Sequence, residues 1–309
     1  MKDRDRERAE ELDDALQSYA ADRQPLMGLA EPTTRVVFVR QLIDSLHRVQ
    51  YPQRLLERPL SARRIDPEDE ELFDPIRAAV CQTRQGNHDE ACWLVFLFVT
   101  YGKGKRTGWR LIRDVYSRVR EGGRWDWAAA SADPDAMAQW VIAHSEVLWP
   151  RGTPRPFGPH RQHERVAESG KTLETYVRWI GPGGHHAKFD AAAAASGGDP
   201  GRTFDVLYRE MTATVYRYAR LAVFDYLTML GKLGLAGVIP GSTYMSGATG
   251  PVAGARLLFA GAPDADLSPH WLDTQLIDLD SQLGVGMQVL EDALCNWQKS
   301  PRTFKAFRG

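Results

Sequence analysis

Charged side chains interrupt an otherwise apolar segment at residues 214–234, which the spacing of its apolar residues predicts to be a helix. On one helix, residues three and four apart lie one above the other. Successive residues at these spacings therefore fall near one face: Arg217, Leu221, Asp225, Thr228 and Lys232. Arg217, Arg220 and Lys232 can hold an anionic leaving group, while Asp225 can accept a proton or bind an ammonium group. An ion pair on a helix surface explains the same pattern without chemistry.

A second candidate is the loop FGPHRQHE at residues 157–164. Its Gly and Pro favour an extended turn in which His160 and Arg161 project side by side, an arrangement suited to a phosphate or carboxylate. An ordinary basic loop is the alternative. His160 and His163 are three apart and two histidines are adjacent at 185 and 186, but no HExxH motif or cysteine accompanies them, so we predict no metal site.

The last predicted helix, near residues 285–299, carries polar residues on one face. Asp292 and Asn296 are four residues apart, and Lys299 completes that face opposite an apolar side. These residues are candidates for a functional site. A salt-bridged surface helix explains them equally well.

The string ESGKT at residues 168–172 resembles the end of a phosphate-binding loop. Arg165 stands where the motif GxxxxGK[ST] requires its first glycine, and no apolar strand precedes it. We therefore predict a capped helix start here rather than a nucleotide site.

The net charge of −1 hides a segregation of charge along the chain. Residues 102–124 hold eight Lys or Arg against two acids, and residues 149–188 hold seven against three, whereas residues 66–74 and 264–280 are acidic. Such stretches can form a basic surface for phosphates beside an acidic one. We expect residues 102–124 and the FGPHRQHE loop to line one basic surface that leads into a cleft. Solvated helix faces are the alternative.

Helical periodicity dominates the chain and strand alternation is nearly absent, so we predict an all-α, multi-helix globular fold in two packed lobes. At most a short hairpin is expected, at residues 249–259. We expect a charged N-terminal helix or extension over residues 1–32 and a single helical catalytic domain over residues 33–309. The Pro- and Gly-rich loops within residues 150–200 are the expected place of any lobe boundary. Asp133 followed by proline predicts a helix start.

The cysteines, the N-terminus and the apolar runs exclude several classes of protein. Cys81, Cys92 and Cys295 are odd in number and form no CxxC pair, which argues against disulfides and a zinc cluster. The charged N-terminus has no apolar signal region, and the longest apolar run, ACWLVFLFVTY, is too short to cross a bilayer. We therefore expect a cytoplasmic protein without a membrane partner, and a buried core helix at the apolar run.

Seven segments form a recognisable set: RQLIDSLHRVQYP, LFDPIRAA, EACWLVFLFVTYGK, FGPHRQHE, FDYLTMLGKLG, YMSGATGPVAGARLLFAG and MQVLEDALCNWQKSP. Together they resemble the alpha-glutamyl/putrescinyl thymine pyrophosphorylase family, also called amino acid:DNA transferases, and its third clade most. The resemblance covers nearly the whole chain after Pro32. The family's loop is closer to FGNHRKY, so His160 and Arg161 match it while Pro159 and Gln162 differ.

This resemblance implies a transferase of thymine hypermodification in phages or bacteria, with a helical fold related to helix-hairpin-helix DNA glycosylases. The substrate would be DNA in which a separate kinase has pyrophosphorylated 5-hydroxymethyluracil. A free amino acid or polyamine would displace the pyrophosphate from the exocyclic methylene carbon. The chemistry needs a cationic cradle, a carboxylate for the amine and a pocket for an extruded base. We expect no resident cofactor, although Mg²⁺ can accompany the pyrophosphate.

The resemblance also suggests roles. The cradle would be formed by Arg217, Arg220 and Lys232, and Asp225 would orient or deprotonate the amine, with Asp292 or Asn296 approaching the same space. The candidates for contacts with substrate or DNA are His160, Arg161, Arg40, Arg48, Asn296 and Lys299. Three aromatic residues, Tyr226, Tyr244 and Trp297, can stack on the base, and core positions explain them equally.

Two other classes of function stay open. A helical DNA glycosylase would also use an aspartate and a basic surface, but it would break the glycosidic bond and leave an abasic site. A non-enzymatic DNA-binding helical protein would contact only backbone phosphates and bind with a steep salt dependence.

Overall fold

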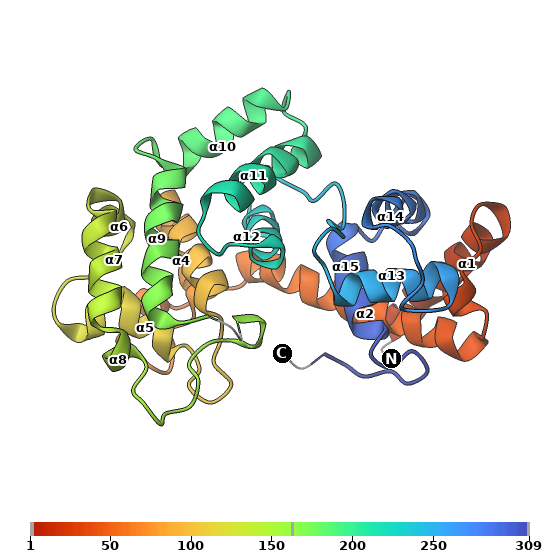
Figure 1. Cartoon of the computed structure of the whole chain (residues 1–309), viewed down its shortest axis with the longest axis horizontal. Helices are drawn as coiled ribbons and strands as arrows, with labels where there is room; N and C mark the ends of the chain where they lie inside the picture. Colours follow the sequence, from red (N-terminus) through yellow and green to blue (C-terminus); the bar gives the residue numbers. More distant parts are fainter. Residues whose placement is uncertain (1–2, 162–163, 308–309) are drawn as a thin grey trace. The chain divides into compact units, whose positions relative to one another are not determined.

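The computed structural model describes residues 3–161 and 164–307. Within these ranges the regular structure comprises fifteen α-helices and four short 3-10 helices (Figure 1). The described residues form no strand, and their one isolated bridge joins Gly104 to Gly108. The predicted all-α fold class is confirmed.

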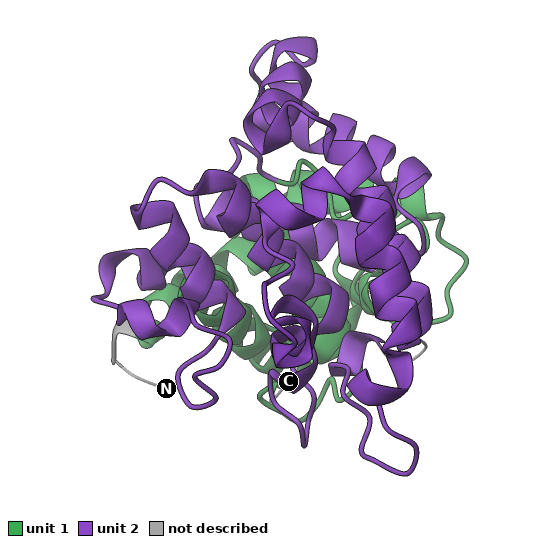
Figure 2. Cartoon of the chain, turned by 90° about the vertical axis from the view of Figure 1, so that its left-hand side faces the viewer, with its two compact units in different colours: residues 1–51, 240–309 green, residues 52–239 purple. Residues whose placement is uncertain are grey.

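The chain divides into two compact units (Figure 2). Unit 1 combines Met1–Tyr51 with Pro240–Gly309, and unit 2 is Pro52–Ile239. The division falls within helix α2 (Pro32–Glu57), which contains Pro52. The loops within residues 150–200, where a lobe boundary was expected, lie inside unit 2.

Unit 1 is built from the two ends of the chain. Besides most of α2, it contains α1 (Asp3–Asp22), η1 (Met27–Leu29), α13 (Gly250–Ala260), α14 (Pro269–Leu283) and α15 (Met287–Trp297). The charged helix α1 belongs to this unit, because Leu12, Leu16 and Tyr19 on one stripe are buried in its core. The same core includes Phe38, Leu290, Leu294 and Trp297.

Unit 2 is organised around α4 (His88–Tyr101), the apolar run of the sequence. Trp93 and Phe96 of α4 are fully buried, which confirms the predicted core helix. The other helices of the unit are η2 (Ala62–Ile65), α3 (Pro75–Arg84), α5 (Arg110–Tyr116), η3 (Arg118–Arg120), α6 (Trp127–Ala132), α7 (Pro134–Ala143), α8 (Ser145–Leu148), η4 (Pro159–Arg161), α9 (Val166–Ile180), α10 (Gly184–Ala195), α11 (Pro200–Thr214) and α12 (Arg220–Lys232).

Local signals in the sequence explain several helix ends. The Asp133 carboxylate accepts a hydrogen bond from the Ala136 backbone N–H at 2.9 Å, and proline occupies the first helical position, as predicted. This helix ends at Ala143, and a separate short helix, α8, continues to Leu148. The ESGKT string lies inside α9, so its glycine does not form a phosphate-binding loop.

Two segments differ from the sequence-based predictions. Residues 249–259 form most of helix α13 and not a hairpin. The segment 214–234 is not one helix, because α11 ends at Thr214 and α12 begins at Arg220. Arg217 lies in the intervening turn with a φ of +56°, in the left-handed region that few residues other than glycine adopt.

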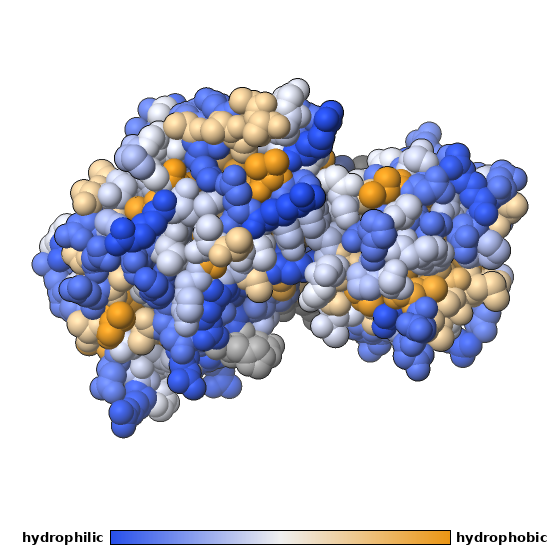
Figure 3. All heavy atoms as spheres, turned by 45° about the horizontal axis from the view of Figure 1, so that its top comes forward, coloured by the Kyte–Doolittle hydropathy of each residue, from blue (hydrophilic) through white to orange (hydrophobic). Residues whose placement is uncertain are grey.

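The surface has the mixed character of a globular protein. On the face drawn in Figure 3, hydrophilic residues predominate and apolar residues occur in small scattered groups. No helix in the described ranges combines the length and the apolar character that crossing a bilayer requires.

Candidate functional site

In unit 2, the FGPHRQHE loop and helix α12 bring predicted site residues together. Burial raises the pKa of the Asp225 carboxyl group, while the positive charges of Arg161, His160, Lys232 and Arg220 act in the opposite direction. Residues about sixty positions apart in sequence therefore share one electrostatic environment. We call Asp225, His160, Arg161, Arg220 and Lys232 the Asp225 cluster.

Helix α12 places Asp225 between buried aromatic residues. Phe224 and Tyr226 on either side of it are fully buried, whereas Asp225 itself is half-buried. The guanidinium group of Arg220 lies 5.1 Å from the centre of the Phe224 ring. Asp225 thus lies where the core meets the surface. A carboxylate there is partly desolvated but still accessible to solvent.

Arg161 turns inward from its loop. Its Nε donates a hydrogen bond of 2.6 Å to the carbonyl oxygen of Val99, near the C-terminal end of α4. Its guanidinium carbon lies 5.9 Å from the centre of the Tyr218 ring. A cation is favourable at the C-terminal end of a helix, because unpaired carbonyl groups gather there. The Gly158 N–H also donates to the Tyr101 carbonyl at 2.8 Å, so the loop is fixed to α4 at two points.

Arg217 occupies a different position from the predicted one. Because it lies in the turn before α12, it does not share a helix face with Asp225. Its guanidinium group forms ion pairs with Glu168 and with Glu164, the latter at 3.5 Å. A non-glycine residue at positive φ costs conformational energy, and such residues concentrate at functional sites. Arg217 therefore joins the α11–α12 turn to the start of α9.

A small pocket opens between these segments. Its lining includes polar, charged and aromatic residues: Thr100, Phe157, Arg161, Glu164, Ser169, Thr172, Arg217 and Tyr218. The cavity measures about 10 Å³, which is room for about one water molecule. Burial raises the pKa of the Tyr218 hydroxyl, so this group stays protonated and can donate a hydrogen bond.

In unit 1, a second group of predicted residues forms one hydrogen-bonded network, here the Arg48 network. Arg48 contacts Asp292 at 2.5 Å and is also paired with Asp44. The Asn296 amide donates to Asp292 Oδ1 at 3.0 Å, and Lys299 Nζ donates to Asn296 Oδ1 at 3.2 Å. The carboxylates of Asp44 and Asp292 offset the charge of Arg48, as in a structural ion-pair network.

Arg40 lies on the same helix as Arg48, is exposed, and contacts an aromatic ring. Its guanidinium carbon is 4.3 Å from the centre of the Phe304 ring. Contacts of Arg40 and Arg48 with DNA phosphates stay a prediction. The predicted approach of Asp292 or Asn296 to Asp225 also stays a prediction, since these residues belong to different units.

The candidate stacking residues differ in accessibility. Tyr226 and Trp297 are fully buried, and Trp297 packs against Phe38 with ring centres 5.0 Å apart. Both are therefore core residues in this structure. Tyr244 is half-buried and has a positive φ of 51°.

Sequence reasoning missed a buried polar chain in unit 2. His185 is fully buried; its Nδ1 lies 2.6 Å from Asp89 Oδ1 and its Nε2 lies 2.6 Å from the Tyr176 hydroxyl. The Tyr176 hydroxyl is 2.5 Å from that of Tyr226. Because the carboxylate accepts, His185 donates from Nδ1 and accepts from Tyr176 at Nε2. No spacing in the sequence links Asp89 to a histidine 96 positions later.

The hydrogen bond from His185 lowers the pKa of Asp89 to about 2, against an ordinary value of 3.8. Burial lowers the pKa of His185, so the ring is neutral at pH 7. Within the described residues no group of three or more His, Cys, Asp or Glu side chains is arranged to hold a metal ion.

Replacing Asp89 by Asn should therefore destabilise the protein in a pH-dependent way. A lowered folded-state pKa contributes stability above pH 3.8 that is lost as the pH falls towards about 2. The melting temperature of the variant should lie below that of the parent at pH 7, and the two should converge as the pH falls. A difference that stays constant from pH 7 to pH 2 would contradict the ionic role of Asp89.

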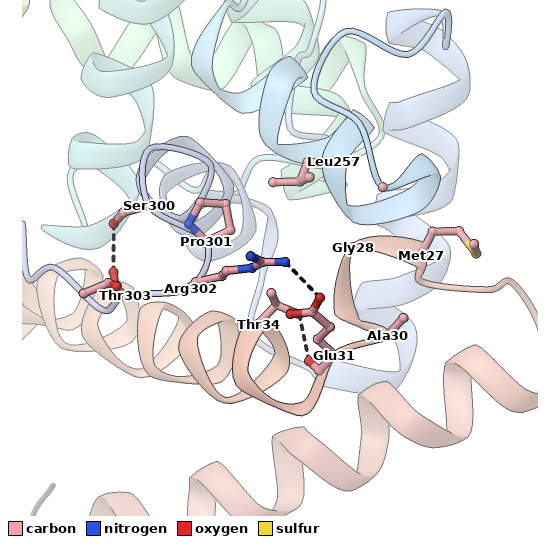
Figure 4. A pocket seen from close by; sticks show the side chains of 11 residues that line it. Met27, Gly28, Ala30, Glu31, Thr34, Leu257, Ser300, Pro301, Arg302 and Thr303 are labelled. Atoms are coloured by element: carbon pink, nitrogen blue, oxygen red, sulfur yellow. Dashed lines mark hydrogen bonds and ion pairs between the residues drawn. The ribbon is translucent and has the colours of Figure 1, made fainter.

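A larger pocket of about 480 Å³ lies in unit 1, between η1 and residues 300–303 (Figure 4). Arg302 pairs with Glu31 at 2.9 Å at its edge, and the Thr34 hydroxyl donates to the Glu31 carbonyl at 2.8 Å. None of the site residues predicted from the sequence lines this pocket. The two charged residues that line it, Glu31 and Arg302, already pair with each other. The Asp225 cluster is therefore the stronger candidate site.

Comparison with known proteins supplies one match. The family described as alpha-glutamyl/putrescinyl thymine pyrophosphorylase, clade 3, matches residues 33–309 of the chain. No curated protein and no solved structure matches. The relation to helix-hairpin-helix DNA glycosylases therefore stays a prediction.

Proposed function

Because the chain belongs to the alpha-glutamyl/putrescinyl thymine pyrophosphorylase family, clade 3, we propose that it is a cytoplasmic transferase of DNA thymine hypermodification. Its substrate is 5-(pyrophosphoryloxymethyl)uracil in DNA, and its second substrate is the amine of an amino acid or polyamine. The observation that carries this proposal is the gathering of His160, Arg161, Arg220 and Lys232 around Asp225.

The reaction is a substitution at the exocyclic methylene carbon. The lone pair of the neutral amine attacks this carbon, and the bond from carbon to the pyrophosphate oxygen breaks with both electrons going to oxygen. The attacking nitrogen then loses one proton, which gives a secondary amine on the base and free pyrophosphate. An amine that arrives as ammonium must lose a further proton before it can attack.

Asp225 is the group suited to accept the proton that the ammonium loses before the attack, and the proton lost after the attack goes to the released pyrophosphate or to water. A carboxyl group whose pKa is raised by burial is a stronger base than an exposed one, provided that it is still ionised at working pH. The surrounding cations keep its pKa from rising further, which favours the ionised form. Asp225 can therefore first bind the ammonium group and then accept a proton from it.

The cations around Asp225 suit the leaving group. Pyrophosphate gains negative charge as the carbon–oxygen bond breaks, and Arg and Lys side chains held in place by the protein stabilise that charge. Arg217 already binds Glu164 and Glu168, so a pyrophosphate would have to replace these carboxylates. Once displaced, the two glutamates are free to bind the incoming ammonium group.

The pocket beside Arg161 must open for this reaction. A cavity of about 10 Å³ holds neither an extruded base nor a pyrophosphate group. Its walls include the Arg217 turn and the FGPHRQHE loop, and exchange of the Arg217 ion pairs for pyrophosphate would separate them. Binding of the substrate would thus create the site that the reaction uses.

A single assay tests the proposal. The protein is incubated with DNA that carries pyrophosphorylated hydroxymethyluracil and with a mixture of amino acids and polyamines, and the digested nucleosides are analysed by mass spectrometry. The proposal expects an amine adduct on the modified base and release of pyrophosphate, and no adduct on hydroxymethyluracil DNA that lacks pyrophosphate. Abasic sites would instead identify a glycosylase, and unchanged nucleosides with salt-sensitive DNA binding would identify a binding protein.

A further inference from the structure

A short basic hairpin next to the candidate site has exposed cations without acidic partners. It comprises residues 103–108, KGKRTG, and we call it the basic hairpin. Lys103, Lys105 and Arg106 are exposed. In the part of the chain that the structure describes, Lys105 and Arg106 form no hydrogen bond or ion pair, and Lys103 contacts only the Trp109 ring, at 5.3 Å.

Most of the other cations in the basic stretch 102–124 are paired within the fold. Arg113 and Arg120 both contact Glu70, at 3.2 and 2.7 Å, and Arg124 contacts Asp66 at 2.9 Å. Acidic residues from 66–74 thus neutralise much of the stretch that the sequence predicted to be one basic surface. The charge that stays available to an external partner is concentrated in the basic hairpin.

The basic hairpin has a fixed backbone. Gly104 and Gly108 exchange two N–H to carbonyl hydrogen bonds of 2.9 Å each, and they enclose a loop of three residues. Gly108 has a φ of +58°, the left-handed conformation that closes such loops. Because the backbone is held in place, binding a ligand at Lys105 and Arg106 requires only the ordering of their side chains.

The basic hairpin also contacts the loop of the candidate site. A Cβ atom on Gly104 would lie 2.6 Å from the Pro156 carbonyl oxygen, and one on Gly102 would lie 3.0 Å from the Gly158 Cα. Only glycine permits this approach. Pro156 and Gly158 lead directly into the segment that carries His160 and Arg161. A chain of phosphates that is held by the basic hairpin would therefore run beside the candidate site.

We propose that the basic hairpin binds the phosphate backbone of duplex DNA beside the modified nucleotide. The inference rests on the proposed function for the identity of the polyanion. Lysine and arginine side chains on a narrow, rigid loop fit consecutive phosphates, and they supply affinity without base specificity. Holding the flanking backbone would position the extruded base at the Asp225 cluster.

The test is the affinity for unmodified duplex DNA, which requires no chemistry. Fluorescence anisotropy is measured over a range of salt concentrations for the parent and for the double variant Lys105→Ala and Arg106→Ala. Loss of two phosphate contacts should weaken binding at least about tenfold at 0.1 M salt and reduce the log–log salt slope by about 1.8. The matched control is Arg120→Ala, whose guanidinium group is already paired with Glu70; it should bind like the parent.

Three results would overturn the proposal. The first two are a double variant with the DNA affinity and salt slope of the parent, and an equal loss of DNA affinity in the Arg120→Ala control. The third, with duplex RNA measured in the same way, is a double variant that loses more affinity for RNA than for DNA. Circular dichroism melting identifies any variant that has lost its fold, and Lys105→Gln with Arg106→Gln then replaces it. The outcome is independent of amine transfer. A parent that transfers amine while the double variant keeps its affinity would refute only the role of the basic hairpin.

Discussion

Replacing Asp225 by Asn is expected to lower the rate of amine transfer by about 10²–10⁴-fold without unfolding the protein. The substitution keeps the size of the side chain and removes its ability to accept a proton. Measurement of adduct formation under single-turnover conditions isolates the chemical step from product release. The loss should appear in that rate and much less in the affinity for DNA.

The stability of the Asp225→Asn variant should equal or exceed that of the parent. Burial raises the pKa of Asp225 in the folded state above its ordinary 3.8. A raised carboxyl pKa means that the ionised group destabilises the folded state at neutral pH, so its removal relieves that cost. If Asp225 were instead one half of a structural ion pair, the same substitution would leave nearby cations uncompensated and lower the melting temperature.

The activity of the parent should rise with pH through the pKa of Asp225, because only the ionised carboxylate accepts a proton. That rise should lie above pH 3.8, since burial shifts the pKa upward. The Asp225→Asn variant should lose this limb of the profile while it keeps any dependence that arises from the amine itself.

Asp114 supplies a matched control for this prediction. Burial also raises the pKa of its carboxyl group, and its nearest cation is Arg110, at 3.9 Å, in the same unit. It lines neither the pocket beside Arg161 nor the Asp225 cluster. Asp114→Asn should therefore transfer amine at the parent rate. An Asp225→Asn protein that folds and reacts as fast as the parent would exclude Asp225 as the base.

The helices themselves could be predicted because their signals are local. Asp133 with its following proline, and the apolar run of α4, act over a few residues, and both predictions are confirmed. The turn at Arg217 could not be predicted in this way, since the apolar spacing continues through it. The Arg217 side chain there pairs with Glu164 and Glu168, which lie about fifty positions earlier in the chain.

The pairing of surface charges also could not be predicted, because it too joins residues that are distant in the sequence. Arg113 and Arg120 share Glu70, which lies more than forty positions away, and local composition gives no measure of such pairing. The sequence did identify the two segments that form the Asp225 cluster, because charged residues in an apolar context need a partner or a purpose. What it could not supply was the fold that brings Arg161 and Asp225 together.

Gly254 is required by the packing of two helices, although in the sequence this glycine looks like a turn signal. Residues 249–259 were expected to be a hairpin at most, but they form much of α13, and Gly254 meets the backbone of α15 there. A Cβ atom at this position would lie 2.3 Å from the Leu294 carbonyl oxygen and 2.7 Å from its carbon. Backbone atoms cannot move aside as a side chain can, so a larger residue must force the two helices apart.

Gly254→Ala should therefore destabilise the protein, although alanine is the better helix former by about 1 kcal/mol. Overpacking typically costs about 1–3 kcal/mol, and Gly254→Val should lie at or above the upper end because it adds two further methyl groups. Thermal melting followed by circular dichroism should show a lower melting temperature for Ala and a still lower one for Val. Gly237→Ala is the control, since a Cβ there meets nothing within 4 Å and its φ is not positive, so it should melt like the parent. A Gly254→Ala protein at least as stable as the parent would mean that α13 and α15 are not in backbone contact at this position.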